Sequence, residues 1–309
     1  MDSEPQYDPP MSEWTENDFD AIQVESGLPV HITMLGPLSE DTIDFYNDQI
    51  SLLDDFDFEH QIQLFEVVEH EGMAYLITER HSYTNLSQRL TEMSENNTNT
   101  DVNELWKLIA NIGVAVEELH RVNLIHGNLS PDNIFFDENG TVFLWKSGLY
   151  PMPEDETLSD TQIIPYWPEE VLNAHKFSPK TDIYSLGMVL NAVINHPVIF
   201  SSSEPDDLIP EVLSYTPSFD SAGIDFLSQC CSSNADDRPT LSFILSQREC
   251  VVYVQKMMKD KIDKEKEAQI AIRIKQHELA DQLAQKQLVR RQLVADLKEA
   301  AKILDNPDS

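Results

Sequence analysis

The chain has 309 residues, and its 55 Asp and Glu against 21 Lys and Arg give a formal net charge of −34. Such acidity disfavours nucleic-acid-binding proteins and proteins that bind anionic membranes. Three cysteines without zinc-ligand spacing, no signal-like start and no long uncharged apolar run indicate a cytoplasmic protein in a reducing compartment.

The charge is unevenly distributed along the chain. Residues 1–250 hold 9 basic and 45 acidic side chains, whereas residues 251–309 hold 12 basic and 10 acidic ones. The acidic part favours basic partners over polyanions such as nucleic acid or ATP. The alternative is that the acidity serves solubility alone.

The first 80 residues predict a small lobe of strands with one helix. Residues 1–19 are acidic and lack regular periodicity, which is typical of disorder. No glycine precedes Gly27, so a glycine-rich phosphate loop cannot lie before it. The predicted elements are two strands joined by a glycine turn over 24–33, a helix over 42–53, strands over 61–68 and 73–78, and a hinge from Glu79.

Residues 102–121 predict a helix that buries one face in a larger lobe. The apolar residues recur at intervals of three and four. They are Leu105, Leu108, Ile109, Ile112, Val116 and Leu119. Further along, residues 133–144 alternate around a turn at Asp137–Gly140, which predicts a hairpin.

Five short motifs then follow in order, and together they resemble those of the eukaryotic protein-kinase family. They stand where the family has H-R-D-L-K-P-x-N, D-F-G, A-P-E, D-x-W-S-L-G and D-P-x-x-R-P-T. The resemblance covers roughly residues 20–248. It implies an α+β, bilobal protein-kinase-like fold with a reduced β-rich N-lobe and a helical C-lobe. The motifs are His126–Asn133, Lys146–Gly148, Pro168–Glu170, Asp182–Gly187 and Asn234–Thr240.

Several residues that the family uses for phosphoryl transfer are replaced in this chain. Asn128 stands at the position of the catalytic aspartate, Ser130 at that of a phosphate-contacting lysine, and Lys146 at that of the metal-binding aspartate. Thr33 stands at the position of the phosphate-binding lysine. Gly127 replaces the arginine that anchors a phosphorylated activation loop. The resemblance therefore implies a pseudokinase without catalytic residues, in which neither ATP nor a metal ion is expected.

Two further positions of the family site are assigned from spacing. The helix over 42–53 offers Gln49 or Asp48 where the family has a lysine-pairing glutamate, and the distance to Leu53 favours Gln49. Asn133, a metal ligand in the family, is retained.

Four retained residues are expected to hold the larger lobe together: His126, Glu170, Asp182 and Arg238. In the family the last arginine pairs with the A-P-E glutamate, which implies an ion pair between Glu170 and Arg238. His120 and His126 are interpreted as structural, with hydrogen bonds to the loop backbone.

The adjacent Cys230 and Cys231 are interpreted as residues of a buried helix, with a redox or metal pair as the alternative. The segment 151–162 corresponds to the activation segment and contains Thr157, Ser159 and Thr161. A phosphate there would meet Gly127 instead of an arginine, so no ordinary phosphorylation switch is expected.

An alternative hypothesis makes the cleft a nucleotide-binding switch or a weak protein kinase that uses Asn133, Lys146 and Ser130. Lys146 would then replace the metal and hold a phosphate. Two observations oppose it. The sequence shows no cradle of backbone N–H groups, and an ammonium repels the Mg²⁺ ion that a carboxylate would hold.

Residues 249–304 predict a long helical or coiled-coil tail. They contain no Pro or Gly and consist largely of strong helix formers. The apolar stripe is not a clean heptad, no a/d register extends over the whole length, and a break or bend is expected near Lys264. A helix with so narrow a stripe needs a partner surface, and the candidates are a second copy, another helical protein and the chain's own lobes.

The sequence thus predicts a pseudokinase that acts as a scaffold or allosteric interaction module, with association through its C-terminal helix. The expected partners are an active kinase or another helical protein, or a second copy through residues 249–304, and neither nucleic acid nor membrane. The predicted divisions are a disordered start at 1–19, an N-lobe at 20–80, a C-lobe at 81–248, the tail at 249–304 and a disordered end at 305–309.

Overall fold

The computed structural model describes residues 7–14, 16–96, 98, 100–150, 166–195 and 221–305. Within the distal helix, side chains are described up to residue 276 and at scattered later positions. The predicted activation segment with Thr157, Ser159 and Thr161 lies outside the described residues. The chain divides into two units, Met1–Val254 and Gln255–Ser309.

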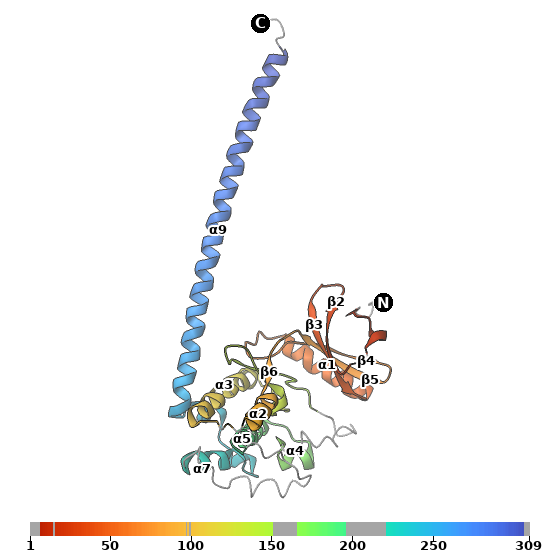
Figure 1. The fold of residues 1–309 in the computed structure, drawn as a ribbon, viewed down its shortest axis with the longest axis vertical. Helices are drawn as coiled ribbons and strands as arrows, with labels where there is room; N and C mark the ends of the chain where they lie inside the picture. The colour runs from red at the N-terminus through yellow and green to blue at the C-terminus, as the bar shows by residue number, and fades with distance from the viewer. Residues whose placement is uncertain are drawn as a thin grey trace. The chain divides into compact units, whose positions relative to one another are not determined.

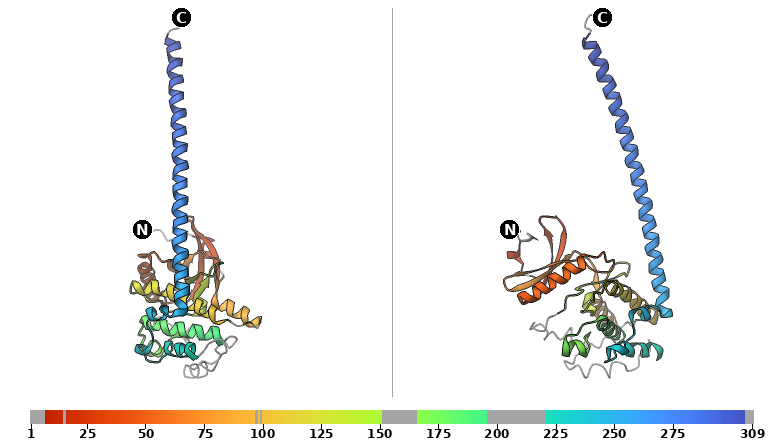
Figure 2. Two further views of the ribbon diagram at one scale, coloured as in Figure 1. Left: turned by 90° about the vertical axis from the view of Figure 1, so that its left-hand side faces the viewer. Right: turned by 180° about the vertical axis from the view of Figure 1, so that it is seen from behind.

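An antiparallel five-stranded sheet forms the smaller lobe of the first unit (Figures 1 and 2). Its order is β1-β2-β3-β5-β4. The predicted strand pair over 24–33 is shifted, because its first strand ends at Gln23 and the turn, with Gly27 at a φ of 70°, occupies residues 24–28. The strands are β1 (Tyr7–Asp8), β2 (Asp18–Gln23), β3 (Pro29–Gly36), β4 (Leu64–His70) and β5 (Met73–Glu79).

The prediction of disorder over residues 1–19 is wrong for residues 7–14 and 16–19. Tyr7 and Trp14 are buried, and β1 pairs with β2. The Trp14 ring meets Phe19 and Tyr75 at centroid distances of 5.5 and 4.9 Å. Burial of two large aromatic side chains offsets the entropy lost on ordering this acidic segment. The described N-lobe sheet therefore has five strands, of which β1 contributes only two residues.

The two faces of the sheet pack against different partners. Helix α1 (Glu40–Asp54) agrees with the predicted helix and starts at Ser39, whose Oγ accepts the Thr42 N–H at 3.1 Å. Tyr46 and Ile50 of α1 pack on one face of the sheet. The cluster around Trp14 covers the opposite face.

The larger lobe is built around α3 (Val102–Arg121), which confirms the predicted helix together with its buried face. The predicted hairpin is present as β7 (Ile134–Phe136) and β8 (Val142–Leu144), and β6 (Thr84–Asn85) extends it to a three-stranded sheet. Side chains from these elements share one apolar core. The remaining helices are α2 (Leu86–Glu95), α4 (Glu169–Ala174), α5 (Pro179–Asn195), α7 (Ser221–Cys230) and α8 (Leu241–Leu245), and the 3₁₀ turns are η1 (Met11–Glu13), η2 (Pro131–Asn133) and η5 (Ala235–Asp237).

His60 and Gln61, which precede β4, form hydrogen bonds between the small lobe and the large one. The ring Nδ1 of His60 lies 2.8 Å from a carboxylate oxygen of Glu118 on α3, and Gln61 Nε2 donates to the carbonyl of Ala115 at 2.9 Å. The N–H of Leu144 on β8 donates to the carbonyl of His60 at 2.8 Å. Side-chain and backbone hydrogen bonds thus hold the two lobes together beside the predicted site.

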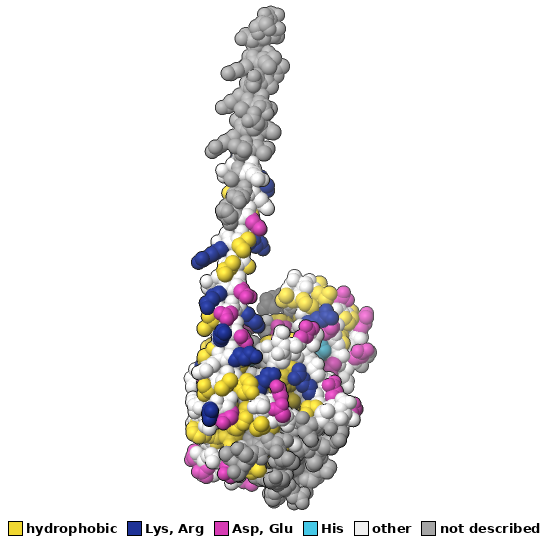
Figure 3. Space-filling view, turned by 60° about the vertical axis from the view of Figure 1, so that its left-hand side comes forward, with side chains coloured by type: hydrophobic (Ala, Val, Ile, Leu, Met, Phe, Trp, Pro, Cys, Tyr) yellow, Lys and Arg dark blue, Asp and Glu magenta, His cyan; other side chains and the backbone are white. Residues whose placement is uncertain are grey.

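The tail is one helix, α9 (Arg248–Asp305), and the predicted break near Lys264 is absent from it. Cys250, Tyr253 and Val254 in its first turns pack in the core of the larger lobe. Farther along, acidic, basic and apolar side chains alternate on its surface (Figure 3). Among the described helices, none combines the length and the hydropathy of a membrane-spanning segment.

Candidate functional site

The loop His126–Asn133 is held by a buried carboxylate from α5. Asp182 accepts the N–H groups of His126 at 2.9 Å and Gly127 at 2.8 Å, and its Oδ2 lies 2.8 Å from Nε2 of His120. Burial alone would raise the pKa of Asp182, but the hydrogen bonds and the nearby imidazoles outweigh it and lower this pKa. The interpretation of His120 as bonded to the loop backbone is wrong, because its ring partner is Asp182.

His126 contributes to the loop as a buried hydrogen-bond acceptor. Its Nδ1 accepts the backbone N–H of Asn128 at 3.1 Å, in agreement with the predicted backbone contact. Burial lowers the pKa of His126 to about 4, although the charge of Asp182 opposes the shift. The imidazole is therefore neutral at neutral pH and has a structural role.

Asn128 occupies the position that the resemblance assigns to the catalytic base. Its side-chain Nδ2 donates to the carbonyl of Leu149 at 3.0 Å, and its backbone carbonyl accepts a hydrogen bond from Nδ2 of Asn133 at 2.7 Å. Ser130, at the position of the phosphate-contacting lysine, is buried with them. An amide has no oxygen basic enough to take a proton from a hydroxyl. The Asn128 side chain instead connects the loop to the chain after β8, and the Asn133 side chain closes the loop on itself.

Lys146 stands at the predicted metal position in a left-handed backbone conformation, with a φ of 59°. Its Nζ lies 4.1 Å from the ring centroid of Trp145, a cation–π contact. The neighbouring Ser147 donates to Oε1 of Gln61 at 2.6 Å. The segment therefore offers an ammonium and an internally bonded hydroxyl where the family needs a carboxylate. Gln61 was not identified as a site residue from the sequence, because its partner Ser147 lies 86 residues farther along the chain.

The position of α1 settles which residue replaces the family's glutamate. A Cβ built on Gly148 would lie 3.5 Å from Oε1 of Gln49, whereas Asp48 is exposed. Gln49 therefore faces the site, as the spacing favoured. Thr33 is buried, and its Oγ1 has no hydrogen-bond partner among the described residues. Because neither Gln49 nor Thr33 carries a charge, they cannot form the ion pair of the family.

The connection between β1 and β2, where the family has its glycine-rich loop, folds onto the far face of the sheet. Trp14 shares a cluster with Ile32 and Ile77. Along β5 the neighbouring Leu76 belongs to the cluster against α1, so Ile77 and Trp14 lie on the opposite face. In the family this connection covers the nucleotide phosphates. Here Trp14 of this connection packs on the face of the sheet opposite α1.

Aromatic rings line the region between β3 and the β7–β8 hairpin. The ring centroid of His81 lies 5.6 Å from that of His31 and 4.9 Å from that of Phe135, and Phe135 lies 5.6 Å from Trp145. Burial lowers the pKa of His81 to about 4, with a smaller contribution from His31. The family resemblance places the adenine site in this region, which is lined here by aromatic rings.

The same region is bordered by carboxylates from β2. Nδ1 of His31 lies 3.0 Å from Oδ1 of Asp20, and Nε2 of His31 lies 3.7 Å from Oδ1 of Asp18. Nε of Arg80 lies 2.8 Å from the other oxygen of Asp20. Two carboxylates at the edge of the cleft disfavour a polyanionic ligand.

A second aromatic group fills the space beside Gly127. Gly127 has a φ of 70°, and a Cβ built on it would lie 2.6 Å from Cδ1 of Tyr150. The Tyr150 ring stacks on Phe177 at 3.9 Å and meets Phe45 of α1 at 5.5 Å, and Trp167 Nε1 donates to the Gly127 carbonyl at 2.9 Å. Tyr150 thus lies where a side chain of residue 127 would extend. No pattern in the sequence indicated this contact.

The ion pair predicted between Glu170 and Arg238 is present in the structure. The two terminal nitrogens of Arg238 lie 2.5 and 2.9 Å from the two oxygens of Glu170. The Arg238 side chain is fully buried, and its Nε also donates to the carbonyl of Ser232 at 2.8 Å. This bidentate pair joins α4 to the segment before α8.

The cysteines are free thiols. Cys230 is buried, and a Cβ on Gly187 of α5 would lie 2.6 Å from Sγ of Cys231, so α5 and α7 pack closely at this glycine. Burial raises the pKa of Cys231 to about 12. Close packing and unreactive thiols agree with the interpretation as helix residues.

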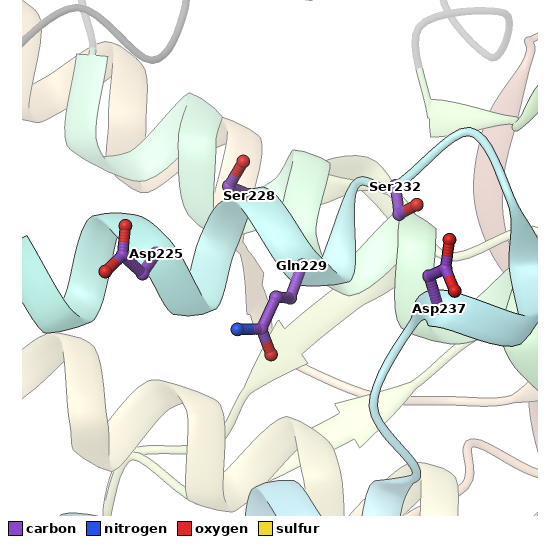
Figure 4. Close-up of a pocket in the computed structure, with 5 residues that line it drawn as sticks. All are labelled: Asp225, Ser228, Gln229, Ser232 and Asp237. Atoms are coloured by element: carbon purple, nitrogen blue, oxygen red, sulfur yellow. The ribbon is translucent and has the colours of Figure 1, made fainter.

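Other polar groupings lie outside the degenerate site. A depression of about 350 Å³ runs along α7 and η5 (Figure 4), and its lining is polar and partly acidic: Asp225, Ser228, Gln229, Ser232 and Asp237. Glu59, His60 and Glu118 bring potential metal-ligand atoms within 4.8 Å of one another. Both carboxylate oxygens of Glu118 already accept hydrogen bonds from His60, which makes this a structural pair.

Comparison with known proteins places the chain among protein kinase sequences. Residues 38–249 match the family model described as protein kinase domain. The probable serine/threonine-protein kinase pknA2 of Bifidobacterium longum is 23% identical over 240 residues, which is 72% of this chain and 31% of that protein.

Two other relatives match shorter parts. The hormonally up-regulated neu tumor-associated kinase homolog of Xenopus tropicalis is 28% identical over 147 residues, 45% of this chain and 20% of that protein. An inactive leucine-rich repeat receptor-like serine/threonine-protein kinase of Arabidopsis thaliana is 26% identical over 171 residues, 50% of this chain and 28% of that protein. The chain spans less than a third of the length of each of the three relatives.

Proposed function

Because the chain belongs to the protein kinase domain family, we propose that it is a pseudokinase, which uses the kinase fold as a scaffold or allosteric interaction module and transfers no phosphate. Its helix α9 mediates association. The proposal depends mainly on Asn128, which stands at the position of the catalytic base. Its side chain is an amide, and its Nδ2 donates a hydrogen bond to the carbonyl of Leu149.

The lost groups are those on which phosphoryl transfer depends. The reaction is driven by positioning and by cations that neutralise developing charge on the phosphate. Removal of one such group commonly raises the barrier by about 3 kcal/mol, or roughly a hundredfold in rate. Thr33, Asn128, Ser130 and Lys146 all depart from the required chemistry. The losses are not additive, but they act on every stage from nucleotide binding to proton removal.

Nucleotide binding is opposed by three features of the cleft. The β1–β2 connection packs on the far face through Trp14, the rings of His81, Phe135 and Trp145 line the interior, and the carboxylate of Asp18 lies at its border. An ammonium at Lys146 further repels a divalent cation. These features support a protein that works without ATP and Mg²⁺.

The contacts around the site favour a fixed arrangement of the lobes. In active members of the family, the helix that carries the paired glutamate is positioned by charge and by activation-loop phosphorylation. Here α1 meets Tyr150 through Phe45, and Gln61 bonds Ser147. These apolar and neutral contacts do not depend on a bound nucleotide or phosphate. A permanently assembled surface suits a scaffold or an allosteric partner.

The partners that we propose are proteins, either an active kinase or another helical protein. The acidic composition of residues 1–250, with 45 acidic and 9 basic side chains, disfavours nucleic acid and anionic membranes. The exposed part of α9 supplies apolar and basic side chains for association.

A thermal-shift titration of the full chain with ATP, alone and with Mg²⁺ or Mn²⁺, tests the proposal together with a phosphoryl-transfer assay. We expect no metal-dependent rise in Tm and no transfer above that of an Asn128→Ala variant. A metal-dependent rise that is lost in Lys146→Ala and kept in the surface control Lys107→Ala would contradict it. That result would support the alternative, a nucleotide-binding switch or weak kinase that uses Asn133, Lys146 and Ser130.

A further inference from the structure

The distal part of α9 exposes an apolar seam. Seven of its described apolar side chains are between 50% and 66% exposed to solvent, and five of them lie along one stripe. A helix with such a stripe gains stability only when the stripe is covered. Which surface covers it follows from the register of the helix and from its charges. The five are Met258, Ile262, Ile272, Leu279 and Leu283.

Because α9 has no break, its apolar positions can be read in a single register. From Met258 to Leu297 the apolar residues of the seam are 4, 7 or 10 residues apart. All of them fall on a single series of positions spaced alternately by four and three residues. This register covers only part of the tail, and polar residues occupy some of its positions, so the expectation that no a/d register extends over the whole length still stands. Ile270 and Ile274 lie outside the seam. The positions in order are Met258, Ile262, Glu265, Gln269, Ile272, Gln276, Leu279, Leu283, Lys286, Arg290, Leu293 and Leu297.

We propose that two copies of the chain associate through α9 as an antiparallel pair, with the two-fold axis between residues 277 and 278. This inference rests on the association role proposed above for α9, and it names the partner as a second copy. In an antiparallel pair, each a position packs against a d position of the other helix. The axis between 277 and 278 decides which residues meet.

Apolar positions meet apolar positions in this arrangement. Met258 faces Leu297 of the second copy, Ile262 faces Leu293, and Ile272 faces Leu283. Close to the axis, Gln276 faces Leu279, the one layer that joins an amide to an apolar side chain. The two-fold symmetry repeats each of these layers in the other half of the pair. The apolar part of the seam is therefore self-complementary.

The charged positions of the seam meet partners of opposite or neutral character. Glu265 faces Arg290 of the second copy, and Gln269 faces Lys286. Beside the seam, at the g positions, Lys261 faces Asp296. The two pairs of opposite charge, Glu265 with Arg290 and Lys261 with Asp296, each occur twice by symmetry, which gives four attractive charge pairs. Glu265 and Arg290 are exposed in the single chain, which leaves both available for this contact.

A parallel pair in register is disfavoured by the same residues. It would place Glu265, Lys286 and Arg290 each opposite its own copy, and at the flanking positions Lys261 would face Lys266. Like charges in adjoining positions are destabilising. An antiparallel pair shifted by one heptad is also disfavoured, because Ile262 would face Lys286 in one direction and Leu297 would face Glu265 in the other. Among these arrangements, the antiparallel pair with its axis between residues 277 and 278 is the one that brings opposite charges together.

Sedimentation equilibrium of the full chain tests the pairing. We expect a dimer of the 35.3 kDa chain at micromolar concentration. Glu265→Arg places Arg against Arg290 and Arg290→Glu places Glu against Glu265, so each is expected to raise the dimer Kd by about tenfold or more. The double variant Glu265→Arg/Arg290→Glu is expected to restore the Kd. Glu267→Arg makes the same charge change on the outer face and serves as the matched control.

Cysteine cross-linking of the full chain tests the orientation. Met258→Cys and Leu297→Cys chains, mixed and oxidised, are expected to form a disulfide between them, whereas Met258→Cys alone is not. In an antiparallel pair the two copies of residue 258 lie about 58 Å apart, from the helical rise of 1.5 Å per residue. The native thiols give little background, since burial raises the pKa values of Cys231 and Cys250 to about 12.

A monomeric chain, single charge variants that dimerise as well as the parent, or a Met258→Cys chain that cross-links to itself would each overturn the antiparallel pair. None of these outcomes bears on nucleotide binding or transfer. The pseudokinase proposal and the pairing proposal can therefore fail separately.

Discussion

The ring of Tyr150 occupies the place that a side chain on Gly127 would need. A Cβ on Gly127 would lie 2.6 Å from Cδ1 of Tyr150, and the backbone there has a φ of 70°. The family has an arginine at this position that binds an activation-loop phosphate. In this chain the position therefore carries an aromatic packing contact, where the family has a charged side chain.

We expect Gly127→Ala to destabilise the protein by about 2 kcal/mol more than Gly140→Ala, from the cost of overpacking. Both glycines have a positive φ, at 70° and 78°, so the backbone strain is matched. A Cβ on Gly140 meets no atom within 4 Å, so the difference measures the clash with Tyr150. Urea unfolding of both variants gives the two free energies. Equal losses would show that the ring moves aside at little cost.

Restoring the family's base is expected to damage the fold without creating an enzyme. Asn128→Asp removes the donor to the Leu149 carbonyl at a buried position, at a cost of about 2 kcal/mol. The control Asn96→Asp removes a similar donor to the Glu92 carbonyl on the surface and should cost about 0.5 kcal/mol. Urea unfolding and a transfer assay measure the two effects. Phosphoryl transfer by the Asn128→Asp variant would contradict the expectation.

The buried ion pair is expected to be among the most sensitive positions of the larger lobe. Arg238→Lys loses the bidentate contact with Glu170 and the bond to the Ser232 carbonyl, at a cost of about 3 kcal/mol. Arg121→Lys is the control, since Arg121 pairs with Glu117 on the surface of α3 and should lose less than about 0.5 kcal/mol. Chemical denaturation compares the two. A small loss at Arg238 would mean that the lobe holds together without this pair.

Stability is expected to fall with pH below neutrality because of His126. Burial lowers its folded-state pKa from 6.5 to about 4, so the unfolded chain binds this proton more tightly. The free energy of unfolding should therefore decrease as the pH falls from about 6.5 toward 4, by about 2 kcal/mol between pH 7 and pH 5 for this group. His81, whose pKa is also lowered to about 4, acts in the same direction.

The measurement is urea unfolding at several pH values with His126→Asn, whose side-chain oxygen can still accept the Asn128 N–H. The variant should show a shallower pH dependence than the parent. The same slope in both proteins would assign the effect to other groups. His81→Asn, examined separately, reports the second histidine.

The sequence by itself determined the order of the main helices and strands of the larger lobe and the replacement of the catalytic residues. The buried face of α3, the β7–β8 hairpin, the pair of Glu170 with Arg238 and the assignment of Gln49 were all predicted, because they depend on local periodicity or on motif positions. The replacements at Thr33, Asn128, Ser130 and Lys146 are visible in the sequence alone, since they are matters of residue identity.

The tertiary structure decided what replaced the lost chemistry. The strand at Tyr7, the contact of Gln61 with Ser147 and the ring of Tyr150 beside Gly127 join residues that lie far apart in the chain. Such contacts leave no periodic signal, because their stability comes from burial and hydrogen bonding that exist only once the lobes are packed. For the same reason, an acidic N-terminal segment that looks disordered becomes the edge of the sheet when Trp14 is buried.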